Sequence, residues 1–152
     1  MTNMVTSIAE RIQPEERPPI VLTALDRNRL LALLRAAVTT IDTGIAGFLG
    51  EEIARADIAP NDLASNSVVR MGCEVKFIDH SAARIRCAEL VFPEDAWNNH
   101  CISILSSIGS ALIGLGPGQS IRWTEQGRAR SLAVLEVRAS TRRSSRSEMD
   151  RS

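Results

Sequence analysis

The stretch that decides the fold is Ser-Ser-Ile-Gly-Ser-Ala-Leu-Ile-Gly-Leu-Gly-Pro-Gly-Gln, residues 106–119. We expect Ser107 to cap a short apolar helix, because a serine hydroxyl can satisfy free amide groups in the first helical turn. Gly114 predicts the end of that helix, and Pro117-Gly118 predicts a turn that leads into a strand. The glycines do not indicate a phosphate loop, since the stretch lacks a Gly-Lys-Ser/Thr ending and precedes a strand.

Five strand candidates surround this stretch. The first two alternate apolar and polar side chains, as a strand with one buried face does. The second loses this alternation near residues 88–91, which a β-bulge would explain. A final hairpin is expected around Gln126-Gly127, and its last strand is apolar on both faces, which predicts a place inside the sheet. The candidates are residues 74–79, 84–91, 101–105, 120–123 and 131–137.

Ahead of the strands, residues 23–57 have helical periodicity. Thr23 and Asp26 have the spacing of a capping box, with Asp in place of the usual Glu or Gln. The first helix is expected from residue 24 to about residue 40, and an amphipathic second helix follows the break at residues 42–44. Two such helices with a short connection predict an antiparallel hairpin.

These patterns divide the chain into four segments and indicate the α+β class. Residues 1–18 end in prolines and charges without periodicity, which is typical of a disordered leader. Residues 19–63 are expected to form the helical hairpin, a short coiled coil, and residues 64–139 the sheet domain with its short helix. Residues 140–152 form an Arg- and Ser-rich tail that we also expect to be disordered.

Composition narrows the classes of function. Of the 152 residues, 44% are hydrophobic, and 18 basic residues balance 18 acidic ones. A net charge of zero argues against a dedicated or sequence-specific nucleic-acid binder, and so does the absence of tyrosine. Three cysteines without a CxxC pair favour a reducing compartment. Because no run resembles a signal peptide or a membrane span, we expect a cytoplasmic protein without cofactors.

Residues 106–119 resemble the S-P-L-G-x-A-L-L-G-x-x-x-G-D signature in the C-terminal domain of the bacterial Gre transcript-cleavage factors. Within that superfamily, four further stretches are similar to the family of regulators of nucleoside diphosphate kinase (Rnk). Residues 68–77 are similar to V-x-M-x-S-x-V-x-F, residues 90–93 to L-V-Y-P and residues 117–123 to x-G-D-S-I-x-W, and residues 19–23 lead into a leucine-rich helix. The resemblance spans roughly residues 20–138.

The resemblance implies a Gre-type sheet domain, related in fold to FK506-binding proteins, preceded by a helical hairpin. It also implies binding to core RNA polymerase near its secondary channel. The family name implies an effect on nucleoside diphosphate kinase that can be indirect. We therefore expect a non-catalytic transcription regulator that competes with Gre factors.

Gre factors place two acidic residues at the tip of a long hairpin, where they help to bind a catalytic Mg²⁺ through convergent carboxylate oxygens. Here the expected tip offers Asp42, whereas Glu51 and Glu52 lie about 13 Å along the second helix. Glu51 also has the i,i+4 spacing of an ion pair with Arg55. A first helix of about 25 Å is several turns shorter than that of a Gre hairpin. We therefore expect no stimulation of transcript cleavage.

Seven residues are candidates for partner contacts. Three belong to the signature and stand where Gre factors have proline, often arginine, and aspartate. Asp42 is either a contact at the hairpin tip or the N-cap of the second helix. Trp97 either anchors a partner or folds back over the sheet. The candidates are Thr40, Asp42, Thr43, Trp97, Ser107, Ser110 and Gln119.

Two other functions are compatible with the same fold. A prolyl isomerase would need an aromatic-lined pocket, for which the sheet region offers few residues. An adaptor would use the same surfaces, or its basic tail, for another regulator. The three cysteines are expected to be small core residues rather than metal ligands together with His100. The aromatic residues available to an isomerase are Phe77, Phe92, Trp97 and Trp123.

Overall fold

The structure, a computed structural model, describes residues 17–37, 43–64 and 66–140. The expected leader and tail therefore lie outside it, apart from their residues nearest the fold. No helix in the described ranges is long and apolar enough to cross a membrane. The elements are β1 (Val21–Thr23), α2 (Ala24–Ala36), α3 (Thr43–Arg55), β2 (Asp57–Ala59), β3 (Cys73–Asp79), β4 (Arg84–Val91), the 3₁₀-helix η2 (Pro93–Asp95), β5 (Cys101–Ser103), α4 (Ser107–Leu112), β6 (Ser120–Glu125) and β7 (Arg128–Ala139).

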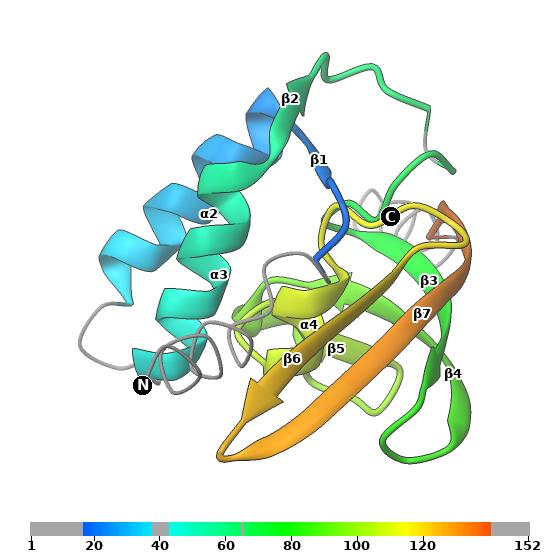
Figure 1. Cartoon of the computed structure of the whole chain (residues 1–152). Helices are drawn as coiled ribbons and strands as arrows, with labels where there is room; N and C mark the ends of the chain where they lie inside the picture. The colour runs from blue at the N-terminus through cyan, green and yellow to red at the C-terminus, as the bar shows by residue number, and fades with distance from the viewer. Residues whose placement is uncertain (1–16, 38–42, 65, 141–152) are drawn as a thin grey trace, which may run out of the picture.

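Five strands form the main sheet in the order β5-β4-β3-β7-β6 (Figure 1). Neighbouring strands are antiparallel except β4 and β5, which are parallel, so the expected antiparallel sheet has one parallel edge. The β6–β7 hairpin was expected, and both Gln126 and Gly127 at its turn have positive φ angles. This combination is that of a type I′ turn, which matches the twist of the two strands.

The β-bulge lies in β7, and not in β4 as expected. β3 and β4 pair without interruption. Between β3 and β7 the register shifts, because Lys76 pairs with Glu136 and Phe77 with Val134, which skips Leu135. The extra residue reverses the alternation of β7, so that Val134 and Val137 are both buried while Leu135 is 40% exposed. The bulge thus accounts for apolar residues on both faces of a strand that does lie inside the sheet.

The N-terminal region contains two helices and a small sheet. β1 and β2 form a parallel pair that the sequence did not indicate. α2 and α3 lie side by side in opposite directions (Figure 1). Thr23 is the N-cap of α2 and accepts a hydrogen bond from the Asp26 amide. The Asp26 carboxylate does not complete a capping box but accepts a hydrogen bond from the Met71 amide, which ties α2 to the start of the sheet region.

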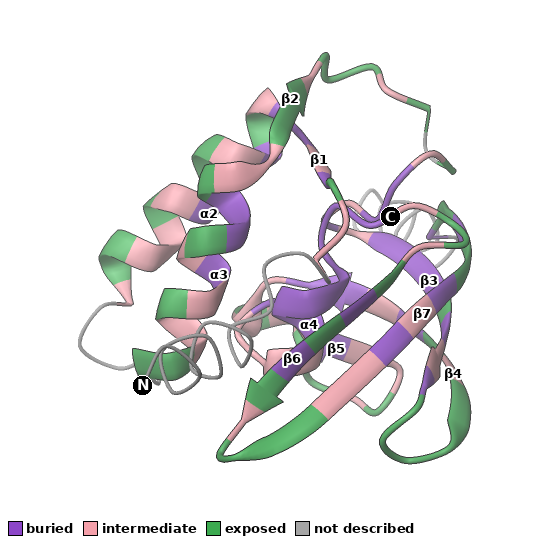
Figure 2. Cartoon of the chain, in the orientation of Figure 1, coloured by how far each residue is buried: buried purple, intermediate pink, exposed green. Residues whose placement is uncertain are grey.

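One hydrophobic core joins the helices to the sheet. Leu30 of α2 and Leu49 of α3 belong to the same buried cluster as Phe77 of β3. Each such side chain contributes roughly 1.5–3 kcal/mol when fully buried. Figure 2 shows α4 buried between α3 and the sheet, and α4 contacts α3, β5 and β6. The region that contains the signature is therefore the centre of the fold.

The cysteines only partly follow the expectation. Cys73 is buried and Cys101 is half-buried, but Cys87 is exposed on β4 and is no core residue. No group of three or more His, Cys, Asp or Glu side chains within the described ranges could hold a metal ion.

Candidate functional site

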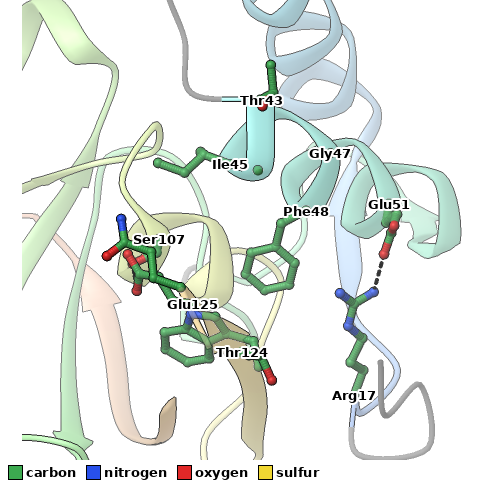
Figure 3. Close-up of a pocket in the computed structure, with 12 residues that line it drawn as sticks. Arg17, Thr43, Ile45, Gly47, Phe48, Glu51, Ser107, Thr124 and Glu125 are labelled. Atoms are coloured by element: carbon green, nitrogen blue, oxygen red, sulfur yellow. Dashed lines mark hydrogen bonds and ion pairs between the residues drawn. The ribbon is translucent and has the colours of Figure 1, made fainter. Parts of the chain in front are cut away.

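A cleft of about 480 Å³ lies where the start of α3 faces the start of α4 and the end of β6 (Figure 3). The first turns of α3 form one wall. Ser107 and the β6 end form the other, and Arg17 closes one side. The lining residues are Arg17, Thr43, Gly44, Ile45, Gly47, Phe48, Glu51, Ser107, Trp123, Thr124, Glu125 and Gln126.

Two stacked aromatic rings line the cleft. Phe48 of α3 and Trp123 of β6 lie with their centroids 6.1 Å apart at an interplanar angle of 22°. Each ring also faces a guanidinium group, with Arg17 at 4.9 Å from the Phe48 centroid and Arg130 at 5.5 Å from the Trp123 centroid. Such pairs contribute beyond their buried area, so this stack fixes α3 against the sheet.

Glu125 holds the second wall in place. Its Oε1 accepts hydrogen bonds from the Ser107 hydroxyl and from the Arg130 guanidinium, each at 2.8 Å. These contacts lower the pKa of Glu125, and the Arg130 bond has the largest effect. The nearby indole N–H of Trp123 makes a smaller contribution that also lowers the pKa of Glu125, although no hydrogen bond of good geometry joins the two groups. The carboxylate therefore stays charged at neutral pH and links α4 to β6.

Arg17 and the two residues after it form a strap across the molecule. Arg17 contacts Glu51 at 2.8 Å and the buried Glu52 at 3.5 Å, both on α3. Arg55 donates to Glu52 and to the Pro18 carbonyl. On the opposite side the Gln119 amide donates to the Pro19 carbonyl, so the strap connects α3 to the turn before β6. Arg55 was expected to pair with Glu51, but its partner is Glu52.

The signature stretch is held by backbone contacts. Ser106, and not Ser107, is the N-cap of α4, since its hydroxyl accepts from the Gly109 amide. The expectation placed the cap one residue too late. A Cβ on Gly109 would lie 2.1 Å from the Ser103 carbonyl oxygen, so only glycine allows α4 to approach β5 this closely. At the other end Gly114 has a positive φ angle and donates its amide to Val69.

A second charged cluster lies outside the cleft. The buried carboxylate of Glu74 on β3 contacts His100 Nε2 at 2.9 Å and accepts from Arg138 Nε at 2.7 Å. The hydrogen bond with His100 is the main cause that lowers the pKa of Glu74, and Arg138 adds to it. His100 and Arg138 are both partly exposed, so this cluster is a network of charged side chains at the surface of the sheet, and we assign it a structural role.

Two protein-family profiles match the sequence of this chain. The GreA/GreB C-terminal profile of transcription elongation factors matches residues 64–139, and the Rnk N-terminus profile matches residues 18–58. The regulator of nucleoside diphosphate kinase from Escherichia coli (strain K12) is 33% identical over 123 residues, which cover 80% of this chain and 90% of that protein. The chain belongs to the Rnk family.

Gre factors are also similar to this Rnk-family protein. The transcription elongation factor GreA from Chelativorans sp. (strain BNC1) is 29% identical over 133 residues, 82% of this chain and 85% of that protein. The solved structure of a prokaryotic transcription elongation factor GreA/GreB from Nitrosomonas europaea has a TM-score of 0.61 and 33% identity. It covers 80% of this chain and 98% of that one, which shows the shared α+β fold.

The cleft brings together two of the predicted contact residues of the Rnk-family protein. Thr43 is exposed at the start of α3, and Ser107 is half-buried at the start of α4. Thr40 and Asp42 lie outside the described residues. The alternatives for Asp42, a tip contact or an N-cap, therefore stay predictions.

The other three predicted contact residues lie outside the cleft. Ser110 is fully buried and donates its hydroxyl to the Ile104 carbonyl, so it has no surface to offer a partner. Gln119 stabilises the strap and the turn at Gly116. Trp97 follows η2 and is 64% exposed. Its role as a partner anchor stays a prediction.

Sequence reasoning missed most of the cleft. Phe48 belongs to the expected amphipathic second helix, and nothing in the sequence indicated that it stacks on Trp123, 75 positions later. The Glu125–Arg130 pair gave no local signal, although the Gln126-Gly127 turn brings β6 and β7 together and places residues 125 and 130 near each other on neighbouring strands. Arg17 was assigned to the leader. Its position just before two prolines and a strand was the only available sign of an ordered role.

Proposed function

We propose that this protein is a non-catalytic regulator of transcription that binds core RNA polymerase near the secondary channel and competes there with Gre factors. Membership of the Rnk family and similarity to GreA over 82% of the chain support this function. We place the binding site at the cleft. It lies between the Rnk-type helices and the GreA/GreB-type sheet, and its walls contain both Thr43 and Ser107.

The test is binding of the purified full chain to core RNA polymerase, measured by fluorescence anisotropy with and without a competing GreA. We expect saturable binding in the micromolar range or tighter, with mutually exclusive occupancy. Absence of binding at micromolar concentrations would overturn the proposal. Simultaneous binding of both proteins would overturn competition.

Two glycines on α3 provide a matched pair of variants for the location of the site. A Cβ on either Gly47 or Gly50 meets no atom within 4 Å, but only Gly47 lines the cleft. We expect Gly47→Arg to weaken polymerase binding about tenfold by filling the cleft, and Gly50→Arg to change it less than twofold. Equal effects of the two variants would exclude the cleft as the docking surface.

The proposed role is non-catalytic because both carboxylates of α3 already pair with arginine side chains of the same chain. Glu51 contacts Arg17, and Glu52 is buried against Arg55. The 13 residues of α2 extend only about 20 Å, which limits how far the paired helices can project. In a cleavage assay on a backtracked complex we expect no stimulation. Cleavage at the rate given by GreA would contradict a non-catalytic role.

An effect on nucleoside diphosphate kinase would then be indirect and would follow from changed transcription. The name of the Escherichia coli relative, regulator of nucleoside diphosphate kinase, supports this link. We expect the purified protein to leave the activity of purified nucleoside diphosphate kinase unchanged. A dose-dependent change in kinase activity would instead indicate direct regulation.

A further inference from the structure

The main sheet has a core face and an outer face. Val75 and Phe77 of β3 are buried in the core. Successive side chains of a strand point to opposite sides, so Lys76 and Ile78 belong to the outer face. Helix α4 packs on the core side, where it contacts β5, β6 and α3 (Figure 1). The outer face comprises Glu74, Lys76 and Ile78 of β3, Ile85, Cys87 and Glu89 of β4, and Ala133, Leu135, Glu136 and Arg138 of β7.

An exposed apolar stripe crosses the outer face. The strand register places Ile85 of β4 and Ala133 of β7 on either side of Ile78. Ile85 is 61% exposed, and the β7 bulge adds Leu135, which is 40% exposed, beside this stripe. Single exposed aliphatic residues are common, but neighbouring ones on three adjacent strands are typical of a surface that binds another protein.

Charged residues beside the stripe are arranged in pairs of opposite sign. Lys76 of β3 lies in register with Glu136 of β7. Glu74 of β3 lies in register with Arg138 of β7, so the signs on the two strands are exchanged in this second pair. A two-fold rotation that exchanges β3 and β7 therefore brings each charge opposite a charge of the other sign. The outer face is complementary in charge to a second copy of itself.

This complementarity defines how a second copy would lie on the outer face. A two-fold axis parallel to the strands, between β3 and β7, lays β3 of one copy over β7 of the other. Lys76 then faces Glu136 of the second copy, and the symmetry repeats this contact with the roles exchanged. Leu135 lies near the axis, where it packs against Leu135 of the second copy. Two sheets stacked in this way are about 10 Å apart, and the side chains of the stripe fill the space between them.

We propose that the outer face is a self-association surface through which two copies of this chain form a symmetric dimer. The five strands, about 4.8 Å apart and about seven residues long, give this face an area of roughly 500 Å². Stable complexes bury about 800 Å² per partner, so the dimer is weak and its population depends on concentration. Trp123 of the cleft belongs to the core cluster on the opposite face, so the dimer is independent of the proposed function.

Sedimentation equilibrium of the full chain tests self-association. We expect the average mass to rise from that of the monomer toward twice that value between about 1 μM and about 1 mM protein. A monomer at every concentration would overturn the proposal.

Two exposed leucines provide a matched pair of variants for the location of the interface. Leu135 lies on the outer face, whereas Leu25 is 50% exposed at the start of α2. We expect Leu135→Gln to raise the dissociation constant of the dimer about tenfold, because an apolar contact near the axis is lost from both copies. Leu25→Gln should change this constant less than about twofold. Equal effects of the two variants would overturn the assignment to the outer face.

Charge reversal tests the two-fold arrangement. Lys76→Glu and Glu136→Lys should each weaken self-association about tenfold, because each substitution turns two attractive contacts between the copies into repulsive ones. Mixed in equal amounts, the two variants should form a heterodimer, since one has only negative and the other only positive charges at positions 76 and 136. Mixing cannot repair a defect within one copy, so this recovery identifies a contact between copies. Glu94→Lys, at an exposed position of η2, is the charge control and should leave self-association unchanged. A mixture that stays monomeric would overturn the proposed dimer.

Discussion

At the scale of single residues, Gly109 lies at a very close approach between two backbone segments. A Cβ at this position would meet the Ser103 carbonyl oxygen at 2.1 Å, and that atom belongs to the backbone. We expect Gly109→Ala to lower the free energy of unfolding by about 2–4 kcal/mol, because α4 must move away from β5. Urea denaturation measures this value, and a loss below 0.5 kcal/mol, roughly the scale of a neutral surface change, would contradict the packing argument.

Gly47 should respond in the opposite direction. It lies in the interior of α3, and a Cβ there meets no atom within 4 Å. Gly47→Ala should therefore raise the free energy of unfolding by about 0.5–1 kcal/mol, since alanine loses less conformational entropy in a helix. The same denaturation experiment measures both substitutions, and destabilisation by Gly47→Ala would mean that the cleft wall is more crowded than described.

The pKa of Glu74 gives a prediction with a defined sign. Hydrogen bonding to His100, and then Arg138, lowers the pKa below its ordinary value of 4.5 in the folded protein. The unfolded chain thus binds a proton more readily, and the stabilisation is present above pH 4.5 and is lost as the pH falls through the lowered pKa. Urea unfolding from about pH 6 to pH 3 should show a smaller loss of stability for Glu74→Gln than for the unmodified chain.

Glu74→Gln should also cost on the order of 1–3 kcal/mol at pH 7, because charged hydrogen bonds are lost. Glu94→Gln, at an exposed position, is the matched control. An unchanged pH dependence in Glu74→Gln would show that other carboxyl groups dominate acid unfolding.

Single residues also show where sequence reasoning stops. Thr23 was predicted as a cap because its spacing to Asp26 is a local pattern, and the structure confirms it. In the pair Ser106-Ser107 both hydroxyls could serve as the cap, and no local pattern distinguishes them. The choice is made by tertiary contacts, since Ser107 donates to Glu125 on β6.

At the scale of elements, the strap depends on one arginine. Arg55 donates to the buried Glu52 carboxylate and to the Pro18 carbonyl. We expect Arg55→Met to destabilise the fold by roughly 1–3 kcal/mol, less than a fully buried pair would cost because Arg55 is 26% exposed. Urea denaturation measures the change.

Glu51→Gln is the matched variant for this prediction. It removes the exposed partner of Arg17 and should cost less than about 1 kcal/mol. Equal losses in Arg55→Met and Glu51→Gln would contradict the view that burial of Glu52 sets the strength of the strap.

The elements that sequence reasoning identified have strong local periodicity, and those it missed do not. β3, β4 and the β6–β7 hairpin were expected from alternation and from the Gln126-Gly127 turn. β1 and β2 have only three residues each and pair across 36 positions, so no window of sequence contains their partner. The bulge at Leu135 was placed in the wrong strand, because loss of alternation in β4 and apolarity on both faces of β7 are equally weak signs.

At the scale of the whole molecule, the shared core predicts joint unfolding of helices and sheet. Leu30, Leu49 and Phe77 belong to one cluster, and the Phe48–Trp123 stack lies at the junction. We expect far-UV circular dichroism and Trp123 fluorescence, in a Trp97→Phe background, to report the same urea midpoint. Two separated transitions would indicate that the helical and sheet parts are independent domains.

The candidate site could be predicted only in part at this scale. Thr43 and Ser107 were selected because of the resemblance to Gre factors, and the fold places both at one cleft. That they meet depends on packing of α3 against α4, which no spacing in the sequence reveals. The aromatic floor requires the same packing, so it too was beyond a sequence-based prediction.

The strap has a consequence for the synthesis of the protein on the ribosome. Pro19 leaves the ribosome early, but its partner Gln119 lies 100 positions later in the sequence. The Val21 amide likewise has no hydrogen-bond partner until Gly114, whose carbonyl accepts from it, has been synthesised. Until most of the chain has emerged, β1 has no complete set of partners, and the apolar faces of α2 and α3 stay uncovered. Such late closure slows folding and exposes nascent chains to aggregation. The fold is therefore expected to close only when translation of the chain is nearly complete.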